Sequence, residues 1–269
     1  MKTIIICCNY NEGRTGNLER CLTYLQQAKL PNTIVGIIDN ASKDNSKDII
    51  DKYKANNVID YVLMAPKNFG KAKGLNMLFK QLLTLYDISS QDLVLHIDSD
   101  IAMYKNYIKD AEYCFKTYPN CQLFISNGSS ILNEFKKDNL HIFDYNKLQN
   151  TPDNNYQFMP MCPGICGCIW TMKVWSFCYV NYYRENLGKN GTSAIYGGDD
   201  GLLNLDLLQL FKYTPASVYL NPNEYHYHPK TNDIKYQEWK NTQNALIAAK
   251  LFNNDQNADD ELAGKGFFD

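Results

Sequence analysis

Two aspartates separated by one residue follow a strongly apolar segment of this sequence. Leu93–Ile97 is typical of a buried strand, and Asp98-Ser99-Asp100 comes directly after it. In open α/β sheets, ligands bind outside the carboxyl ends of the strands. Two carboxylates this close repel each other in a dry site unless a cation offsets their charge. The triplet therefore predicts a site for Mg²⁺ or Mn²⁺, which prefer oxygen ligands. The competing interpretation is a solvated turn that happens to carry two acidic residues.

A histidine pair offers a further metal ligand. His226 and His228 flank Tyr227, and alternate residues of an extended segment point the same way. We expect one of the two imidazoles to complete the metal shell, and we prefer His228. A structural role is the alternative, since isolated histidines often have one. An ion held here would take up the charge of a departing phosphate group as a Lewis acid.

Another acidic residue ends an earlier predicted strand. The strand Thr33–Ile38 runs into Asp39, and Ser42 and Asp44 follow as candidate helix caps. A carboxylate at this place can accept a hydrogen bond from a ring N–H of a base such as uracil. The competing interpretation is a helix N-terminus with spare polar residues.

The loop before the clearest predicted helix suits an anion. It reads Asn68-Phe69-Gly70-Lys71, and Asn76 lies in the helix that follows. Gly70 permits close approach of the backbone to a ligand, and a helix N-terminus beside a lysine attracts negative charge. The glycine spacing matches neither a P-loop nor a dinucleotide-binding fingerprint. An ordinary loop into a helix is the alternative.

Adjacent carboxylates open a later predicted helix. Asp199 and Asp200 lie between Gly198 and Gly201, where the helix dipole favours negative charge and the glycines leave room for a ligand. An acceptor hydroxyl needs a base within hydrogen-bond reach before it can attack an anomeric carbon. We expect this pair to supply that base, and the alternative is a capped helix start.

The cysteines argue against a structural zinc site. Cys162, Cys166, Cys168 and Cys178 lack the paired C-x2-C spacing of such sites. The chain has nine cysteines, an odd number, and we expect reduced thiols and a cytoplasmic location. Trp170 and Trp175 are predicted to be core residues; stacking on a sugar is the less favoured assignment.

The surrounding sequence predicts how these residues are positioned. Apolar runs alternate with amphipathic segments, the pattern of β-α-β units around a mostly parallel sheet flanked by helices, in one α/β domain. We expect the domain to span residues 1–252, with a binding half at 1–126, a catalytic half at 127–252 and an acidic tail at 253–269. The predicted strands are Thr3–Cys8, Thr33–Ile38, Val58–Leu63, Leu93–Ile97, Gln122–Ser126 and Ala216–Leu220. Helices are predicted over Leu18–Leu25, Asp44–Tyr53, Ala72–Tyr86, Tyr104–Tyr118, Met172–Tyr183, Gly197–Phe211 and Gln237–Leu251.

Composition narrows the classes of function. Hydrophobic residues make up 45% of the 269 residues, enough for a sizeable core. The net charge of −2 gives no global positive field that would attract nucleic acid or an anionic membrane, although a local basic groove is compatible with it. The apolar runs are all shorter than the ~18–20 residues that span a bilayer.

Taken in order, five segments resemble the GT-A fold and, most closely, the family 2 glycosyltransferases. They are Cys8-Asn9-Tyr10-Asn11-Glu12, Asp39-Asn40-Ala41-Ser42-Lys43-Asp44, Asn68-Phe69-Gly70 with Asn76, Asp98-Ser99-Asp100 and Gly198-Asp199-Asp200. The likeness covers roughly residues 1–230 and departs from the family in Cys7-Cys8, where proline or a small residue is usual. The resemblance implies a nucleotide-sugar donor and transfer with inversion at the anomeric carbon.

The resemblance also implies roles for single residues. Asn9, Asn11 and Glu12 would hold the nucleoside, and Asp39 would contact its base. Asp98 would face the ribose or the metal-bound waters, Asp100 would bind the ion, and Asp200 would be the catalytic base, with Asp199 replacing the usual glutamate. Asn68, Gly70, Lys71 and Asn76 would line the nucleotide pocket.

Two other functions compete with the transferase. A sugar-nucleotide pyrophosphorylase needs a Gly-rich basic loop after the first strand, where this chain has Asn-Tyr-Asn-Glu-Gly-Arg-Thr-Gly. A non-catalytic nucleotide-sugar or glycan-binding module would not need Asp199 and Asp200. For a transferase we expect a UDP-sugar donor with Mn²⁺ or Mg²⁺, and the acceptor stays open among glycan, protein, lipid and hydroxymethylated DNA base.

Overall fold

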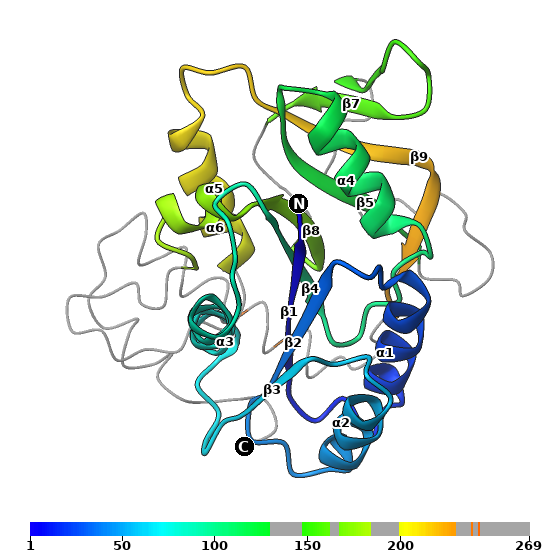
Figure 1. The fold of residues 1–269 in the computed structure, drawn as a ribbon, viewed down its shortest axis with the longest axis vertical. Coiled ribbons are helices and arrows are strands. Elements are labelled where there is room, and N and C mark those ends of the chain that lie inside the picture. Colours follow the sequence, from blue (N-terminus) through cyan, green and yellow to red (C-terminus); the bar gives the residue numbers. More distant parts are fainter. Residues whose placement is uncertain (130–146, 162–166, 184–198, 230–237, 239–241, 243–269) are drawn as a thin grey trace.

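The computed structural model describes residues 1–129, 147–161, 167–183, 199–229, 238 and 242 (Figure 1). Its strands are β1 (Thr3–Asn9), β2 (Thr33–Asp39), β3 (Tyr61–Met64), β4 (Leu93–Asp98), β5 (Cys121–Ser129), β6 (Gln149–Asn150), β7 (Gln157–Pro160), β8 (Ile169–Lys173) and β9 (Ser217–Tyr227). Its helices are α1 (Asn17–Ala28), α2 (Ser46–Ala55), α3 (Lys71–Leu85), α4 (Tyr107–Thr117), α5 (Val174–Tyr179) and α6 (Asp199–Leu210).

The first half of the chain forms the parallel part of the sheet. β1 lies between β2 and β4, and β3 pairs with the far side of β2, all in parallel. β1 is apolar on both faces because helices cover both: Ile4 and Ile6 belong to one core, and Ile5 and Cys7 to the other. Such continuous apolar runs are typical of parallel strands buried on both sides.

The second half extends the same sheet with mixed pairing, in the order β3-β2-β1-β4-β8-β5-β9-β7-β6. β8 is antiparallel to both β4 and β5, whereas β9 runs parallel to β5. The β5–β9 register shifts after Ile125, which pairs with Leu220, so that Asn127 pairs with Tyr225. This irregularity brings the end of β9 to the carboxyl end of β4, where Ala102 and Tyr227 form a β-bridge.

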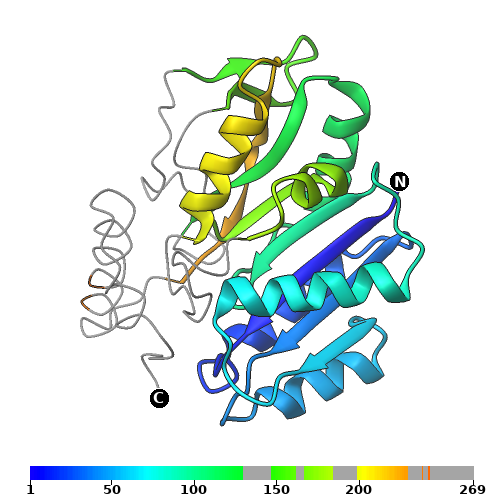
Figure 2. The same cartoon turned by 90° about the vertical axis from the view of Figure 1, so that its left-hand side faces the viewer.

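Helices cover the two faces of the sheet separately (Figures 1 and 2). α1, α2 and α4 pack on one face, around Leu22, Ile50 and Tyr107. α3, α5 and α6 pack on the other, around Phe79, Phe177 and Leu207. The fold is therefore α/β, with helices on both faces of one sheet, which confirms the class expected from the sequence. The sheet is parallel in its first half and mixed in its second half.

Some predicted boundaries were wrong. β3 begins at Tyr61 instead of Val58. One helix was expected from Met172 to Tyr183. Instead, Met172 and Lys173 are the last residues of strand β8, and only Val174–Tyr179 form a helix, α5. The acidic tail, and all but residues 238 and 242 of the last predicted helix, lie outside the described residues.

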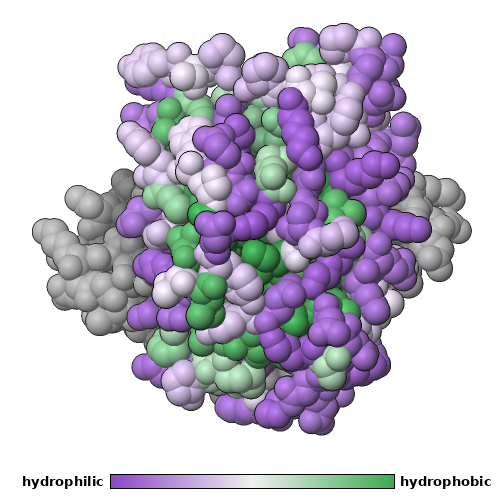
Figure 3. Space-filling view, in the orientation of Figure 1, coloured by the Kyte–Doolittle hydropathy of each residue, from purple (hydrophilic) through white to green (hydrophobic). Residues whose placement is uncertain are grey.

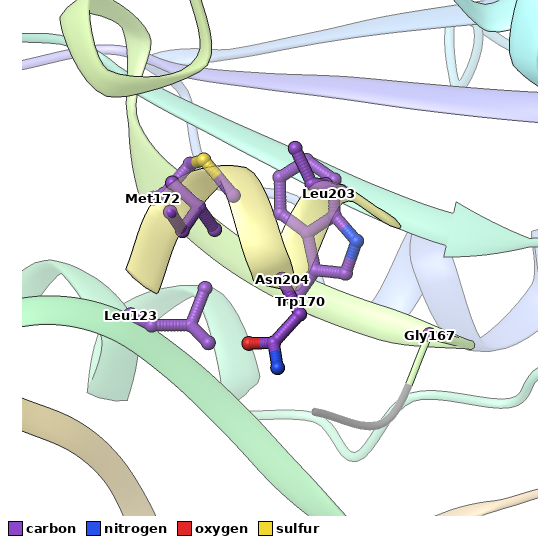
Figure 4. A pocket seen from close by; sticks show the side chains of 7 residues that line it. Leu123, Gly167, Trp170, Met172, Leu203 and Asn204 are labelled. Carbon is purple, nitrogen blue, oxygen red and sulfur yellow. The ribbon is translucent and has the colours of Figure 1, made fainter. Parts of the chain in front are cut away.

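The space under α6 is too small for a substrate. A cavity of about 10 Å³ lies among Leu123, Trp170, Leu203 and Asn204, together with three neighbours (Figure 4). That is room for about one water molecule. A substrate-sized ligand therefore does not fit there.

The view in Figure 3 shows hydrophobic residues in small areas among hydrophilic ones. Among the described residues, no helix reaches the length and apolar content that crossing a bilayer requires.

Candidate functional site

Polar residues end three neighbouring parallel strands at one edge of the sheet. Asn9 ends β1 and pairs with Asp39 at the end of β2, while Cys8 pairs with Asp98 at the end of β4. These strand ends therefore lie along one edge of the sheet, where α/β proteins bind ligands.

Asp39 is the centre of a buried hydrogen-bond network. It is 2% exposed. Its Oδ1 accepts bonds from Asn9 Nδ2 at 2.8 Å and Ser42 Oγ at 2.6 Å, and its Oδ2 accepts one from the Ser42 backbone N–H at 3.1 Å. A carboxylate has about four acceptor positions, so Oδ2 keeps one for a further donor. Ser42, which the sequence suggested only as a cap, is thus a structural member of the site.

The loops after β1, β2 and β3 are joined by side-chain amides. Asn11 Oδ1 accepts the Lys43 N–H at 2.7 Å. Asn68 Oδ1 accepts both Asn40 Nδ2 at 2.7 Å and the Gly70 N–H at 2.9 Å. Gly70 has φ 80° and ψ 161°, a conformation essentially restricted to glycine. These bonds fix the backbone that leads into α3.

Lys71, the first residue of α3, reaches across to the end of β4. Its Nζ lies 2.9 Å from Asp98 Oδ1. The buried His96 Nε2 lies 3.1 Å from the same oxygen. Burial alone would raise the pKa of Asp98, but the Lys71 ammonium and the His96 ring outweigh it and hold this pKa well below its ordinary value. Asp98 is therefore an anion whose charge is already balanced by protein groups.

Asp100 meets a residue from the far end of the chain. Its Oδ2 lies 3.5 Å from His228 Nε2, and both side chains are partly exposed, 28% and 39%. Backbone bonds in both directions between Ala102 and Tyr227, at 2.9 and 2.8 Å, hold the two segments together. His228, the histidine preferred from the sequence, is thus the one that lies beside Asp100.

Glu12 adds negative charge to the same area. Thr15 and Asn17 donate hydrogen bonds to its Oε2, at 2.8 and 3.0 Å. Burial, and to a lesser extent the charge of Asp100, nevertheless raise the pKa of Glu12 above its ordinary value. Carboxylates that disfavour each other's charge are what a cation site requires.

His226 lies deeper in the protein than His228. His226 is fully buried, with its Nε2 3.3 Å from Cys168 Sγ, whereas His228 is partly exposed. The two rings lie with centroids 6.5 Å apart, in agreement with alternation along the strand. Sequence spacing grouped Cys168 with other cysteines, but its partners are histidines. Cys162 and Cys166 lie outside the described residues.

The remaining predicted residues have mixed positions. Asn76, expected in the nucleotide pocket, is 1% exposed and bonds both backbone groups of Tyr183, its Nδ2 donating and its Oδ1 accepting. It therefore positions a neighbouring segment. Asp199 and Asp200 begin α6, but their side chains lie outside the part of the chain that the structure describes. Trp170 is buried, as the core assignment predicted.

Comparison with known proteins identifies the family. The family model described as glycosyl transferase family 2 matches residues 3–176, more than half of the chain. No curated protein matches the sequence. Staphylococcus aureus TarS 1–349 in complex with UDP-GlcNAc aligns with a TM-score of 0.62 and 17% identity, over 97% of this chain and 70% of that one.

Two further solved structures share the fold. The mannosyltransferase PcManGT from Pyrobaculum calidifontis, in complex with GDP-Man and Mn²⁺, aligns with a TM-score of 0.65 and 13% identity, over 94% of this chain and 64% of that one. GalNAc-T7 with UDP, GalNAc and Mn²⁺ aligns with a TM-score of 0.59 and 12% identity, over 87% of this chain and 44% of that one. With the family model matched across the parallel sheet and its polar edge, the chain belongs to glycosyl transferase family 2 and is a glycosyltransferase.

Proposed function

We propose that this chain transfers a sugar from a UDP-sugar to a hydroxyl acceptor, with the help of Mn²⁺ or Mg²⁺. The observation that carries the proposal is the convergence of Asp100, His228 and Glu12 beside the Lys71–Asp98 ion pair. These groups come from four segments of the chain and meet at the carboxyl edge of the sheet, where α/β proteins bind ligands.

The residues present fit a divalent ion. Two ligands of one ion, each at ~2.1 Å, lie about 3 Å apart in octahedral geometry. Asp100 Oδ2 and His228 Nε2, at 3.5 Å, are close to that spacing before any ion draws them together. When bound, such an ion neutralises the diphosphate leaving group as a Lewis acid.

Asp98 is proposed to play a different part from Asp100. Because the Lys71 ammonium already offsets its charge and the His96 ring contacts the same oxygen, Asp98 is the weaker metal ligand and the better acceptor for ribose hydroxyls or for metal-bound water. Lys71, at the N-terminus of α3 and 25% exposed, is placed to attract phosphate oxygens. Asp39 has an acceptor position for a base N–H on its Oδ2.

The acceptor step is assigned to the start of α6. We propose that Asp200, with Asp199 as its neighbour, removes the proton of the acceptor hydroxyl as that oxygen attacks the anomeric carbon. A single displacement of this kind inverts the configuration there. The family assignment supports this role, and a helix N-terminus stabilises the carboxylate form.

The structural relatives support the class of donor. TarS binds UDP-GlcNAc, and PcManGT binds GDP-Man with Mn²⁺. We favour uridine because a single carboxylate acceptor such as Asp39 suits the one ring N–H of uracil.

A thermal-shift panel tests the proposal. UDP, GDP and CDP, with and without Mn²⁺, are added to the wild type, to Asp100→Asn and to the control Asp87→Asn, whose side chain is fully exposed. A ligand at 100 times its Kd stabilises by about 2.7 kcal/mol, which is about 5–11 °C for a protein of this size. We expect this shift with UDP and Mn²⁺ in the wild type and in Asp87→Asn, and little in Asp100→Asn. If no nucleoside diphosphate raises the melting temperature, the proposal is wrong.

A further inference from the structure

A cysteine and two histidines form a cluster beside the proposed ion site. One ligand atom from each of Cys168, His226 and His228 lies within 4.8 Å of the others. Cys168 Sγ and His226 Nε2 are 3.3 Å apart. Around a tetrahedral zinc ion, a sulfur at ~2.3 Å and a nitrogen at ~2.0 Å lie about 3.5 Å apart. The pair is therefore already at the spacing that zinc requires, and His228 has to close in by about 1 Å.

The backbone holds all three residues in place. The Cys168 carbonyl accepts the Asp98 N–H at 2.9 Å, the His226 N–H donates to Ser126 Oγ at 3.2 Å, and the His228 N–H donates to the Ser129 carbonyl at 2.9 Å. Cys168 and His226 are buried, 5% and 0% exposed, whereas His228 is 39% exposed on its side chain. An ion thus enters past His228 and meets two ligands that are already fixed.

Ligand type separates this cluster from the carboxylate site. Thiolate and imidazole ligands select Zn²⁺ and similar ions, whereas Mg²⁺ and Mn²⁺ prefer oxygen. We infer that Cys168, His226 and His228 bind Zn²⁺, and that this ion competes with the donor-site ion for His228. The competition rests on the proposed function; zinc binding does not.

The competition follows from charge and from the shared residue. Asp100 Oδ2 lies 3.5 Å from His228 Nε2, so both sites draw on one imidazole. Two divalent ions bound next to the same imidazole would also repel each other. Zinc binding also displaces the Cys168 thiol proton to solvent, because the metal ligand is the thiolate.

Cobalt spectroscopy tests the binding. Metal-free, reduced wild-type protein is titrated with Co²⁺, which gives a thiolate-to-cobalt charge-transfer band only if sulfur is a ligand. We expect this band in the wild type, its loss on adding Zn²⁺, and its absence in Cys168→Ser. The control Cys178→Ser removes a partly exposed thiol elsewhere and should keep the band. Zinc affinity should fall at least about 10-fold in Cys168→Ser and in His226→Gln. A band that is missing in the wild type, or retained in Cys168→Ser, overturns the inference.

Inhibition tests the competition. Donor hydrolysis with Mn²⁺ is measured with increasing Zn²⁺, each variant relative to its own zinc-free rate. We expect Zn²⁺ to inhibit the wild type, excess Mn²⁺ to relieve the inhibition, and Cys168→Ser to resist it. Zinc that binds without inhibiting overturns the competition. A cobalt band without turnover of any nucleotide sugar refutes the proposed function and leaves the zinc site standing.

Discussion

The buried carboxylate of Asp39 offers a sharp test of how the nucleotide edge is built. Asp39→Asn keeps the size of the side chain and replaces one oxygen with an NH₂ group. In the folded protein, Oδ2 faces the Ser42 backbone N–H, and Oδ1 accepts Asn9 Nδ2 and Ser42 Oγ. If the amide oxygen takes the position of Oδ1, the NH₂ group takes the position of Oδ2. That NH₂ group then faces the Ser42 backbone N–H, so that two donors meet.

The magnitude follows from that mismatch. Leaving one buried donor without an acceptor costs about 1–3 kcal/mol, and the lost bonds to a charged group come on top. Because the site is 2% exposed, water gives little relief. We expect a loss of about 2–3 kcal/mol, which lowers the melting temperature by about 4–12 °C at this chain length.

The assay is thermal unfolding without ligand, followed by UDP titration. Asp51→Asn is the matched control, since its carboxylate is 59% exposed in a surface pair with Lys47 and such pairs contribute about 0–1 kcal/mol. UDP should stabilise Asp39→Asn less than the wild type. A melting temperature within 1 °C of the wild type would refute the network described for Asp39.

Three further changes test neighbouring features. Gly70→Ala should cost about 1–3 kcal/mol, because φ 80° and ψ 161° are strained for any side chain; chemical denaturation measures this, and an unchanged midpoint would contradict it. Lys71→Met should raise the KM for the donor about 10- to 100-fold, because it removes the cation beside Asp98. Lys73→Met, at an exposed lysine two residues further along, is the control and should leave the KM unchanged. Equal effects of the two substitutions would count against the ion pair. For Asp44, burial opposes ionisation, but hydrogen bonds from Ser46 and the Arg14 N–H prevail and lower its pKa below the ordinary 3.8. The ionised Asp44 carboxylate therefore stabilises the folded protein above pH 3.8, and this stabilisation is lost as the pH falls through the pKa of the folded state. The difference in melting temperature between the wild type and Asp44→Asn should shrink below pH 3.8. A difference that stays constant with pH would contradict this.

The sequence predicted the parallel half of the sheet because its signals are local. Strands β1, β2 and β4 are apolar runs that end in polar residues, and parallel pairing brings Asn9, Asp39 and Asp98 to one edge of the sheet, whatever the loops between the strands. The second half was harder, since β8 is an antiparallel strand inserted between β4 and β5, and the β5–β9 register is irregular.

Contacts within the site depended on tertiary structure. The alternation of His226 and His228 predicted that both face one side, but the β-bridge between Ala102 and Tyr227 that brings His228 to Asp100 has no sequence signal. Cys168 is a similar case, because only tertiary structure brings this residue, which precedes β8, into contact with His226 near the end of β9. Asn76 shows the reverse: its motif suggested a ligand, and packing assigned it to the Tyr183 backbone.

The most direct test is the manganese requirement of Asp100. Electron paramagnetic resonance counts Mn²⁺ bound in the presence of UDP, and donor hydrolysis is followed in the same samples after chelator treatment. We predict one bound ion and metal-dependent turnover in the wild type, with both lost in Asp100→Asn and retained in Asp87→Asn. Normal turnover by Asp100→Asn in chelator-treated buffer would contradict the proposed metal site and the chemistry assigned to it.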